Sequence, residues 1–244
     1  MKSAISILML VIAWGGMGAL RPQEENVDVL RTDEGELRIR PITHGSLMLE
    51  FRGKVIHVDP WSRGNYAGLP KADFILITDI HPDHMDRAMV DQLKKETTVI
   101  LAPAAVAETI REAQIIRNGE RKTVDGITIE AIPMYNLVRG PSPGQLYHTK
   151  GRGNGCVLTL GGKRIYISGD TECVPEIKAL RGIDVAFICM NLPFTMPPEE
   201  AAECVKAFRP KIVYPYHYRN SDVNVFANAL KGEAGIEVRL RKWY

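Results

Sequence analysis

The sequence has little of several features that would assign it to a specialised class. Its 244 residues include only four cysteines, 7% aromatic residues and a net charge of +2. So few cysteines exclude a mini-protein held together by disulfides, and so small a charge excess supplies no field for binding nucleic acid or an anionic membrane. With 45% hydrophobic residues, the chain is expected to form one ordinary domain with a substantial core.

A long hydrophobic run occurs only at the N-terminus. Lys2 precedes the apolar run from Ala4 to Trp14, and small residues follow up to residue 20. This order is typical of a signal peptide, which we predict over residues 1–20, with a linker over 21–36 and the mature domain over 37–244. We therefore expect an exported protein, periplasmic or extracellular. The alternative is a retained membrane anchor, because residues 3–20 are uncharged.

The four cysteines show no metal or redox spacing. Cys156, Cys173, Cys189 and Cys204 lie 17, 16 and 15 residues apart, so no two of them form a Cys-x-x-Cys pair. Cys156 and Cys189 lie in apolar, strand-like segments where cysteine behaves as a small buried hydrophobe. We expect no disulfide bridge among the four.

The pattern along the chain predicts two groups of strands, each followed by helices. Such an order favours an αββα sandwich of two mixed sheets between helices over a single parallel βαβ array. The predicted strands are 37–42, 47–51, 55–58, 74–78, 126–132, 156–160, 164–168, 185–190, 212–214 and 236–240, and the predicted helices are 86–95, 103–110, 175–180, 198–208 and 222–230. Gly151, Gly153 and Gly155 precede a strand and are expected to form a flexible loop.

One short segment carries most of the chemistry. Asp79, His81, Asp83 and His84 stand within six positions, directly after the apolar strand 74–78. Imidazole and carboxylate together suit zinc, manganese or iron, and a cation would relieve the repulsion between the crowded carboxylates. The alternative is a solvated acidic turn with incidental histidines. We favour a metal site.

Two later strands also deliver potential ligands at their ends. Asp170 follows the apolar run 165–168 and Gly169, and His217 follows the run 213–216. Taken alone, either residue has an ordinary explanation as a turn aspartate or a surface histidine. Together with the segment 79–84 they complete a set for two metal ions.

The ordered motifs resemble those of the metallo-β-lactamase-fold hydrolases, whose signature is His-x-His-x-Asp-His, a later His, a Gly-Asp carboxylate and a final His. Here the run is Asp79-x-His81-x-Asp83-His84, so aspartate replaces the first histidine. The resemblance spans about residues 37–241 and is greatest to the branch of ascorbate-phosphate lactonases and N-acyl phosphatidylethanolamine phospholipases D. It implies that Asp79 and His81 hold one metal with a third ligand, that Asp83, His84 and His217 hold the second, and that Asp170 bridges them.

The third ligand of the first metal is predicted to be His148. It is the only histidine between His84 and Asp170, and the alternative is a loop histidine. Aspartate at position 79 alters the charge: two divalent ions, Asp79, Asp83, Asp170 and a bridging hydroxide sum to zero. The alternative is that Asp79 only supports another ligand, which leaves one of the two sites weak. Zinc is the expected metal, and the added oxygen ligand moves the preference toward manganese or iron.

These residues predict a hydrolase in which a metal-bridging hydroxide attacks an ester, lactone or phosphodiester bond of a small or lipid-like substrate. Asp83 is the expected proton acceptor. Tyr135, Asn136, Lys150 and Arg219 are the predicted substrate-binding residues, Asp59 orients a ligand, and His44 and His57 are core or supporting groups. Two alternatives remain: a metal-binding scaffold protein of the same fold without turnover, and a di-iron redox protein.

Overall fold

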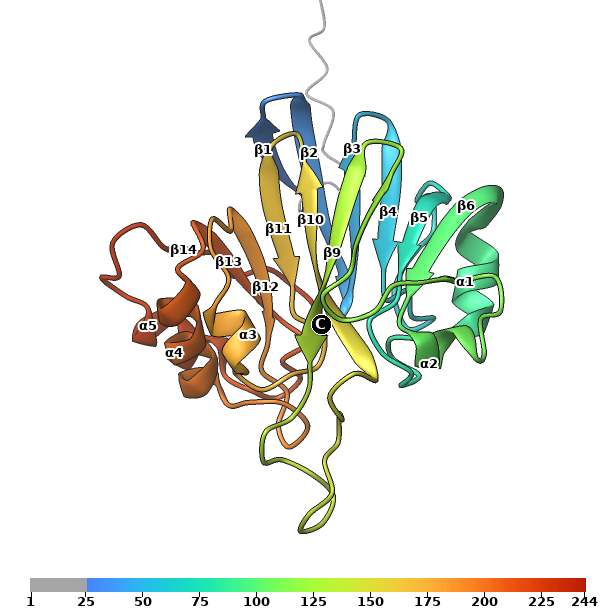
Figure 1. Cartoon of the computed structure of the whole chain (residues 1–244). Helices are drawn as coiled ribbons and strands as arrows, with labels where there is room; N and C mark the ends of the chain where they lie inside the picture. The colour runs from blue at the N-terminus through green and yellow to red at the C-terminus, as the bar shows by residue number, and fades with distance from the viewer. Residues whose placement is uncertain (1–25) are drawn as a thin grey trace, which may run out of the picture.

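The computed structural model describes residues 26–244 and shows two seven-stranded sheets packed face to face, with helices on their outer sides (Figure 1). The predicted signal peptide and the first part of the predicted linker lie outside the described residues. The first sheet contains, in spatial order, β1 (Asp28–Thr32), β2 (Gly35–Thr43), β3 (Ser46–Phe51), β4 (Lys54–Val58), β5 (Ala72–Leu76), β6 (Lys94–Ala102) and β7 (Gln114–Ile115). The second contains β14 (Glu237–Val238), β13 (Ile212–Tyr216), β12 (Val185–Cys189), β11 (Lys163–Ile167), β10 (Gly153–Leu160), β9 (Ile127–Met134) and β8 (Arg121–Val124).

The helices divide between the two outer faces. In Figure 1, α1 (Arg87–Leu93) and α2 (Ala104–Ala107) lie beside β5 and β6, whereas α3 (Pro175–Lys178), α4 (Pro198–Phe208) and α5 (Val223–Ala229) lie beside β12 and β13. This arrangement confirms the predicted αββα sandwich.

The burial pattern of the strands explains this layering. Buried and partly exposed residues alternate along most of β9, whose inner side chains join the core between the sheets. In β12 all five residues are buried, because the other sheet covers one side of the strand and helices cover the other. A second apolar cluster, which includes Met89, Val90 and Ile100, seals the first sheet against α1.

Both sheets place their parallel strands so that the strand ends meet at one edge of the sandwich. β4, β5 and β6 are parallel to one another, as are β11, β12 and β13. The segments that follow β5, β11 and β13 carry the predicted ligands, and the turn between β2 and β3 joins them there. Ligands from distant parts of the chain are thereby brought to one place.

The ordered sheet begins earlier than the sequence indicates. β1 lies within residues 21–36, the range predicted to be a linker, and pairs with β2 along its whole length. This edge strand has no fully buried residue, so its sequence lacks a hydrophobic signal. The prediction of a flexible glycine loop is wrong for two of its three glycines: Gly153 and Gly155 belong to β10 and are buried. A Cβ on Gly153 would lie 2.2 Å from Met134 Cε, so this glycine permits close packing.

The expectation of no disulfide is wrong. Cys173 and Cys204 are bonded, with their Cα atoms 5.6 Å apart. Cys173 lies just before α3 and Cys204 lies in α4, and these two helices pack together. The spacing of the cysteines along the sequence does not indicate that α3 and α4 pack together. Cys156 and Cys189 are free and buried, as expected.

Among residues 26–244, no helix has the length and apolar character needed to cross a membrane.

Candidate metal centre

The predicted ligands converge at the shared edge of the sheets. Their donor atoms form two compact groups, each with all atoms within 4.8 Å of one another. The first group is Asp79, His81 and His148, and the second is His84, Asp170 and His217. A third group of the same kind contains His44, Asp83 and His217, and it shares His217 with the second group.

Asp170 lies between these groups. Its Oδ2 is 3.3 Å from Nε2 of both His84 and His148, and its Oδ1 is 3.5 Å from Nε2 of His217. Those three Nε2 atoms and Oδ1 are buried, yet they form no hydrogen bond. Buried polar atoms without partners are costly. Four of them facing a common point indicate a position suited to a cation.

Local backbone geometry delivers Asp170 and His217 to this point. Gly169 has φ +60°, and a Cβ there would lie 2.3 Å from Met134 Sδ, so only glycine suits this turn. His217 itself has φ 48°, and its ring lies so close to the β2–β3 turn that a Cβ on Gly45 would be 2.9 Å from His217 Cδ2. Each ligand therefore depends on a glycine that lets the backbone approach closely.

Asp59 fixes the orientation of His84. Asp59 Oδ2 accepts a hydrogen bond from His84 Nδ1 at 2.8 Å, and both side chains are fully buried. Asp59 also accepts hydrogen bonds from the backbone and the hydroxyl of Thr78, at 2.7 and 2.6 Å. With its proton on Nδ1, His84 presents the lone pair of Nε2 toward Asp170. Asp59 has the orienting position that the sequence predicts.

Asn136 plays the same part for His148. Its Nδ2 donates to Glu172 Oε1 and to the Phe194 carbonyl, at 3.0 and 2.8 Å, so its Oδ1 must face His148. That oxygen accepts from Nδ1 of His148 at 2.8 Å. His148 is thus held with Nε2 free, on the metal side. The predicted loop between β9 and β10 does fold toward the other ligands.

Asp79 has a partner that the sequence did not reveal. Arg152 forms a two-point contact with it, Nε to Oδ1 at 3.1 Å and a terminal nitrogen to Oδ2 at 3.0 Å. His81 Nδ1 is 2.8 Å from the same Oδ2. Burial raises the pKa of Asp79, but His81, His84 and Arg152 outweigh it and lower that pKa to about 2. Arg152 adds one positive charge, so the predicted neutral centre would be positive when metals are bound.

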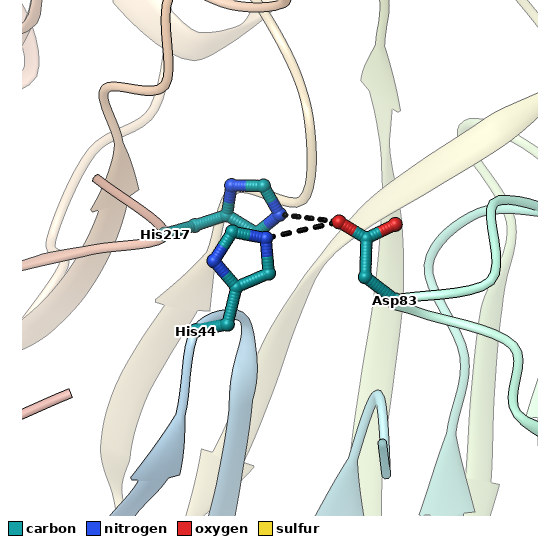
Figure 2. A group of neighbouring side chains, drawn as sticks. All are labelled: His44, Asp83 and His217. Atoms are coloured by element: carbon teal, nitrogen blue, oxygen red, sulfur yellow. Dashed lines mark hydrogen bonds and ion pairs between the residues drawn. The ribbon is translucent and has the colours of Figure 1, made fainter. Parts of the chain in front are cut away.

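Two histidines, His44 and His217, contact the carboxylate of Asp83 (Figure 2). His44 Nε2 donates to Asp83 Oδ2 at 2.9 Å, and His217 Nε2 lies 3.5 Å from the same oxygen. Tyr244 Oη donates to His44 Nδ1 at 2.5 Å and accepts from the Arg219 backbone at 2.8 Å. Burial lowers the pKa of His44 to about 4, which matches a neutral ring in this chain of hydrogen bonds.

The electrostatics of the buried centre favour positive charge. Burial alone would lower the pKa of His84, but Asp170 and Asp59 raise it well above its usual value. Burial would also raise the pKa of Asp170, but His217 and His84 hold it well below its usual value. Surroundings that stabilise a protonated histidine will stabilise a metal ion in its place. The donor set, its unpartnered atoms and its charge all fit two divalent ions.

A cavity of about 180 Å³ opens onto this centre. Of the four predicted substrate-binding residues, Arg219 lines this cavity, whereas Tyr135, Asn136 and Lys150 do not. Asn136 is buried behind His148, and Tyr135 and Lys150 are both bonded to Glu176. The full lining is His81, Pro82, Asp83, Tyr147, His148, Asp170, Asn191, Phe194 and Arg219.

Sequence reasoning missed several residues of this region. Arg152, Tyr147 and Phe194 have no motif, because their roles depend on how two long loops fold. His44 is predicted to be a core or supporting group, and in the structure it is buried and bonded to Asp83. Its left-handed backbone, φ 52°, places it at the sharp turn after β2, a feature that no residue preference indicates.

Comparison with known proteins identifies the family. Residues 38–217 match the family model described as the β-lactamase superfamily domain. A UPF0173 metal-dependent hydrolase from Thermus thermophilus is 30% identical over 217 residues, which are 82% of this chain and 94% of that protein.

Two solved structures are also similar to this chain. A protein from Parabacteroides distasonis, proposed to be a metal-dependent hydrolase, is 41% identical with a TM-score of 0.84, covering 89% of this chain and 99% of its own. CmlA, a diiron β-hydroxylase from Streptomyces venezuelae, is 16% identical with a TM-score of 0.62, covering 82% of this chain and 52% of its own. At that identity the likeness concerns the fold alone.

Proposed function

The chain belongs to the β-lactamase superfamily and is a metal-dependent hydrolase, and we propose that it acts through two divalent ions on an ester, lactone or phosphodiester bond. One ion would be held by Asp79, His81 and His148, and the other by Asp83, His84 and His217. Asp170 would bridge them, since it faces His84, His148 and His217 at once.

The observation that carries this proposal is the set of unpartnered buried atoms around Asp170. A single unpartnered ring nitrogen also occurs elsewhere in the core, at His57 Nδ1, but around Asp170 four unpartnered atoms face one another. Here Nδ1 of His84 and of His148 is bonded to a side-chain oxygen, and Nε2 of each is left free. This is the arrangement that metal-ligating histidines adopt.

Bound in these positions, two divalent ions would supply a hydroxide nucleophile at neutral pH and polarise the oxygen that gains charge. Asp83 is then the proposed proton acceptor, because its carboxylate faces the same space as Asp170. Burial raises the pKa of Asp83, but His217 and His44 bring it well below its usual value. Asp83 is therefore ionised at neutral pH, as a proton acceptor must be. Tyr147 and Phe194, whose rings pack edge to face at 5.0 Å, form an apolar part of the cavity wall.

The donor set favours zinc, with manganese or iron as the alternatives. Four imidazoles suit zinc, while three carboxylates suit the harder ions. Arg152 occupies both oxygens of Asp79, which weakens Asp79 as a donor. The first ion is therefore expected to bind more weakly than the second.

Export is also part of the proposal. It rests on the sequence of residues 1–20 and is supported by the Cys173–Cys204 disulfide, a bond that persists in oxidising compartments.

Metal content and turnover together test the proposal. Protein purified without chelator is analysed by plasma mass spectrometry and assayed on a small lactone, p-nitrophenyl acetate and bis-p-nitrophenyl phosphate. We expect about two equivalents of metal. Turnover should stop with chelator and return with the same ion. Asp170→Asn should lose both metal and turnover, because it removes the negative charge between the two groups.

Asp184→Asn is the matched control. Asp184 lies directly before β12, its partners are Lys211 and the Arg164 backbone, and none of these residues lines the cavity. It should keep metal and turnover. Bound metal without hydrolysis of any substrate would support a scaffold protein instead. Bound iron with oxygen consumption would support redox chemistry.

A further inference from the structure

We propose that the chain binds substrates carrying a second oxyanion, a carboxylate or phosphate not attacked in the reaction, between Arg63 and Arg219 beside the metal centre. This inference rests on the proposed function for its catalytic part, but the binding itself requires no metal. It concerns a second cavity of about 460 Å³, larger than the cavity over the metal ligands. The walls of this oxyanion cavity are Thr43, His44, Trp61, Arg63, Arg219, Asn220 and Tyr244.

The two arginines are placed over aromatic rings and have no acidic partner among the described residues. Among the described residues, neither guanidinium lies within ion-pair distance of a carboxylate. Each is instead placed over an aromatic ring, Arg63 at 5.0 Å from Trp61 and Arg219 at 5.6 Å from Phe194. Stacking fixes a guanidinium while leaving its N–H groups free. Both side chains are therefore prepared to receive an anion.

The side chains that line the cavity between them include no carboxylate, whereas two of them are permanently positive. His44 forms part of the wall and is 1% exposed, and its polar atoms are already bonded to Asp83 and Tyr244. Asn220 and Thr43 add neutral hydrogen-bonding groups. The composition thus selects an oxyanion over a cation or a fully apolar ligand.

The position of the cavity relates it to the reaction. Arg219 lines both cavities, so they adjoin at this side chain. His44 separates them on the other side, with Nε2 on Asp83 and its ring in the oxyanion cavity. A substrate whose scissile bond lies at Asp170 can therefore extend its anionic end past Arg219. Two-point contact of this kind fixes the direction of a small substrate.

Calorimetric titration of metal-free protein with phenyl phosphate and with phenylacetate tests binding without any contribution from metal ions. We expect saturable binding of at least one of them, weaker at high salt, and no binding of neutral benzyl alcohol. Arg63→Gln and Arg219→Gln should each weaken it by about 10-fold or more, as for a lost hydrogen bond to a charged group. The two ligands distinguish a phosphate from a carboxylate preference.

Arg31→Gln is the matched control for the loss of one positive charge. Arg31 is exposed and lies opposite Glu36 at the start of β2. Eight residues separate Glu36 from His44, or about 26 Å at the rise of a strand. Arg31→Gln should leave binding unchanged. Equal weakening by Arg31→Gln and Arg63→Gln, or absence of binding by the unmodified protein, would overturn the proposal.

Turnover by the metal-loaded protein provides the second test. We compare p-nitrophenyl glutarate, which carries a remote carboxylate, with p-nitrophenyl butyrate, which does not. The glutarate ester should have the higher kcat/KM, and Arg63→Gln should reduce the ratio of the two by about 10-fold through KM. A preference for butyrate would refute the oxyanion site. Hydrolysis of neither ester, together with intact phenyl phosphate binding, would instead count against the proposed ester hydrolysis.

Discussion

The contact between Arg152 and Asp79 allows a prediction in which protein stability and metal affinity change in opposite directions. Asp79 is completely buried and Arg152 is 19% exposed. Arg152→Met keeps most of the side-chain volume and removes the charge. In metal-free protein the carboxylate then loses its two-point contact with a permanent cation, while His81 Nδ1 at 2.8 Å and His148 Nε2 at 3.9 Å remain beside it.

The expected size follows from the burial of the pair. Removing one partner of a buried ion pair costs about 3–5 kcal/mol. Because His81 stays in place and Arg152 is partly exposed, we expect the free energy of unfolding of metal-free protein to fall by about 3 kcal/mol. A metal ion on Asp79 would compensate the carboxylate, so the loss in metal-loaded protein should be below about 1 kcal/mol. The difference of about 2 kcal/mol must appear as metal affinity, roughly 30-fold tighter in the variant.

Urea denaturation with and without metal measures both stabilities, and competition with a chromogenic chelator measures the affinity. Arg164→Met is the control, because Arg164 pairs with Glu130 in a half-exposed contact remote from the ligands. It should change the stability of metal-free and metal-loaded protein equally. If Arg152→Met loosens metal binding instead of tightening it, Asp79 does not bind metal, and Arg152 only shapes the loop.

Two further predictions concern neighbouring contacts. Asn136→Leu removes the acceptor that orients His148 and should weaken metal binding by about 10–100-fold in a chelator competition, and unchanged affinity would show that this orientation is irrelevant. For Asp28, burial raises the pKa, but hydrogen bonds from Arg241 and Tyr214 outweigh it, so its pKa is lowered in the folded protein. Its contribution to stability is therefore present above about pH 4 and lost as the pH falls, so the advantage of the unmodified protein over Asp28→Asn in urea melts should shrink on acidification. A constant difference between the two proteins across this pH range would contradict that sign.

The fold was predictable because its signals are local. The strands of both sheets have apolar runs or alternating patterns, and Asp86 marks the start of α1 by accepting a hydrogen bond from the Met89 backbone. Several elements were missed, among them β6, whose first half is mostly exposed although its last three residues are buried. The edge strand β1 buries no residue fully, and β7 has only two residues.

The candidate ligands were predictable for a different reason. His84, Asp170 and His217 each follow an apolar strand, so the chain order alone places them at one edge once the strands are parallel. Residues that act on those ligands have no such order. Arg152 lies 73 positions from Asp79 and reaches it only because the β9–β10 loop folds back over the sheet edge. The disulfide was missed in the same way, because helix packing decides which cysteines meet.

Arg152 also changes what Asp79 implies for the substrate. An aspartate in place of a histidine lowers the charge of the ligand set by one unit, which predicts weaker attraction for anions. The two-point contact with Arg152 restores that unit, so Asp79 and Arg152 together carry no net charge, as a neutral histidine does. The metal-loaded centre would then be positive and would draw anionic groups toward the cavity that Arg219 shares with the proposed oxyanion site. The aspartate is therefore compatible with an anionic substrate, because its charge is neutralised within the protein.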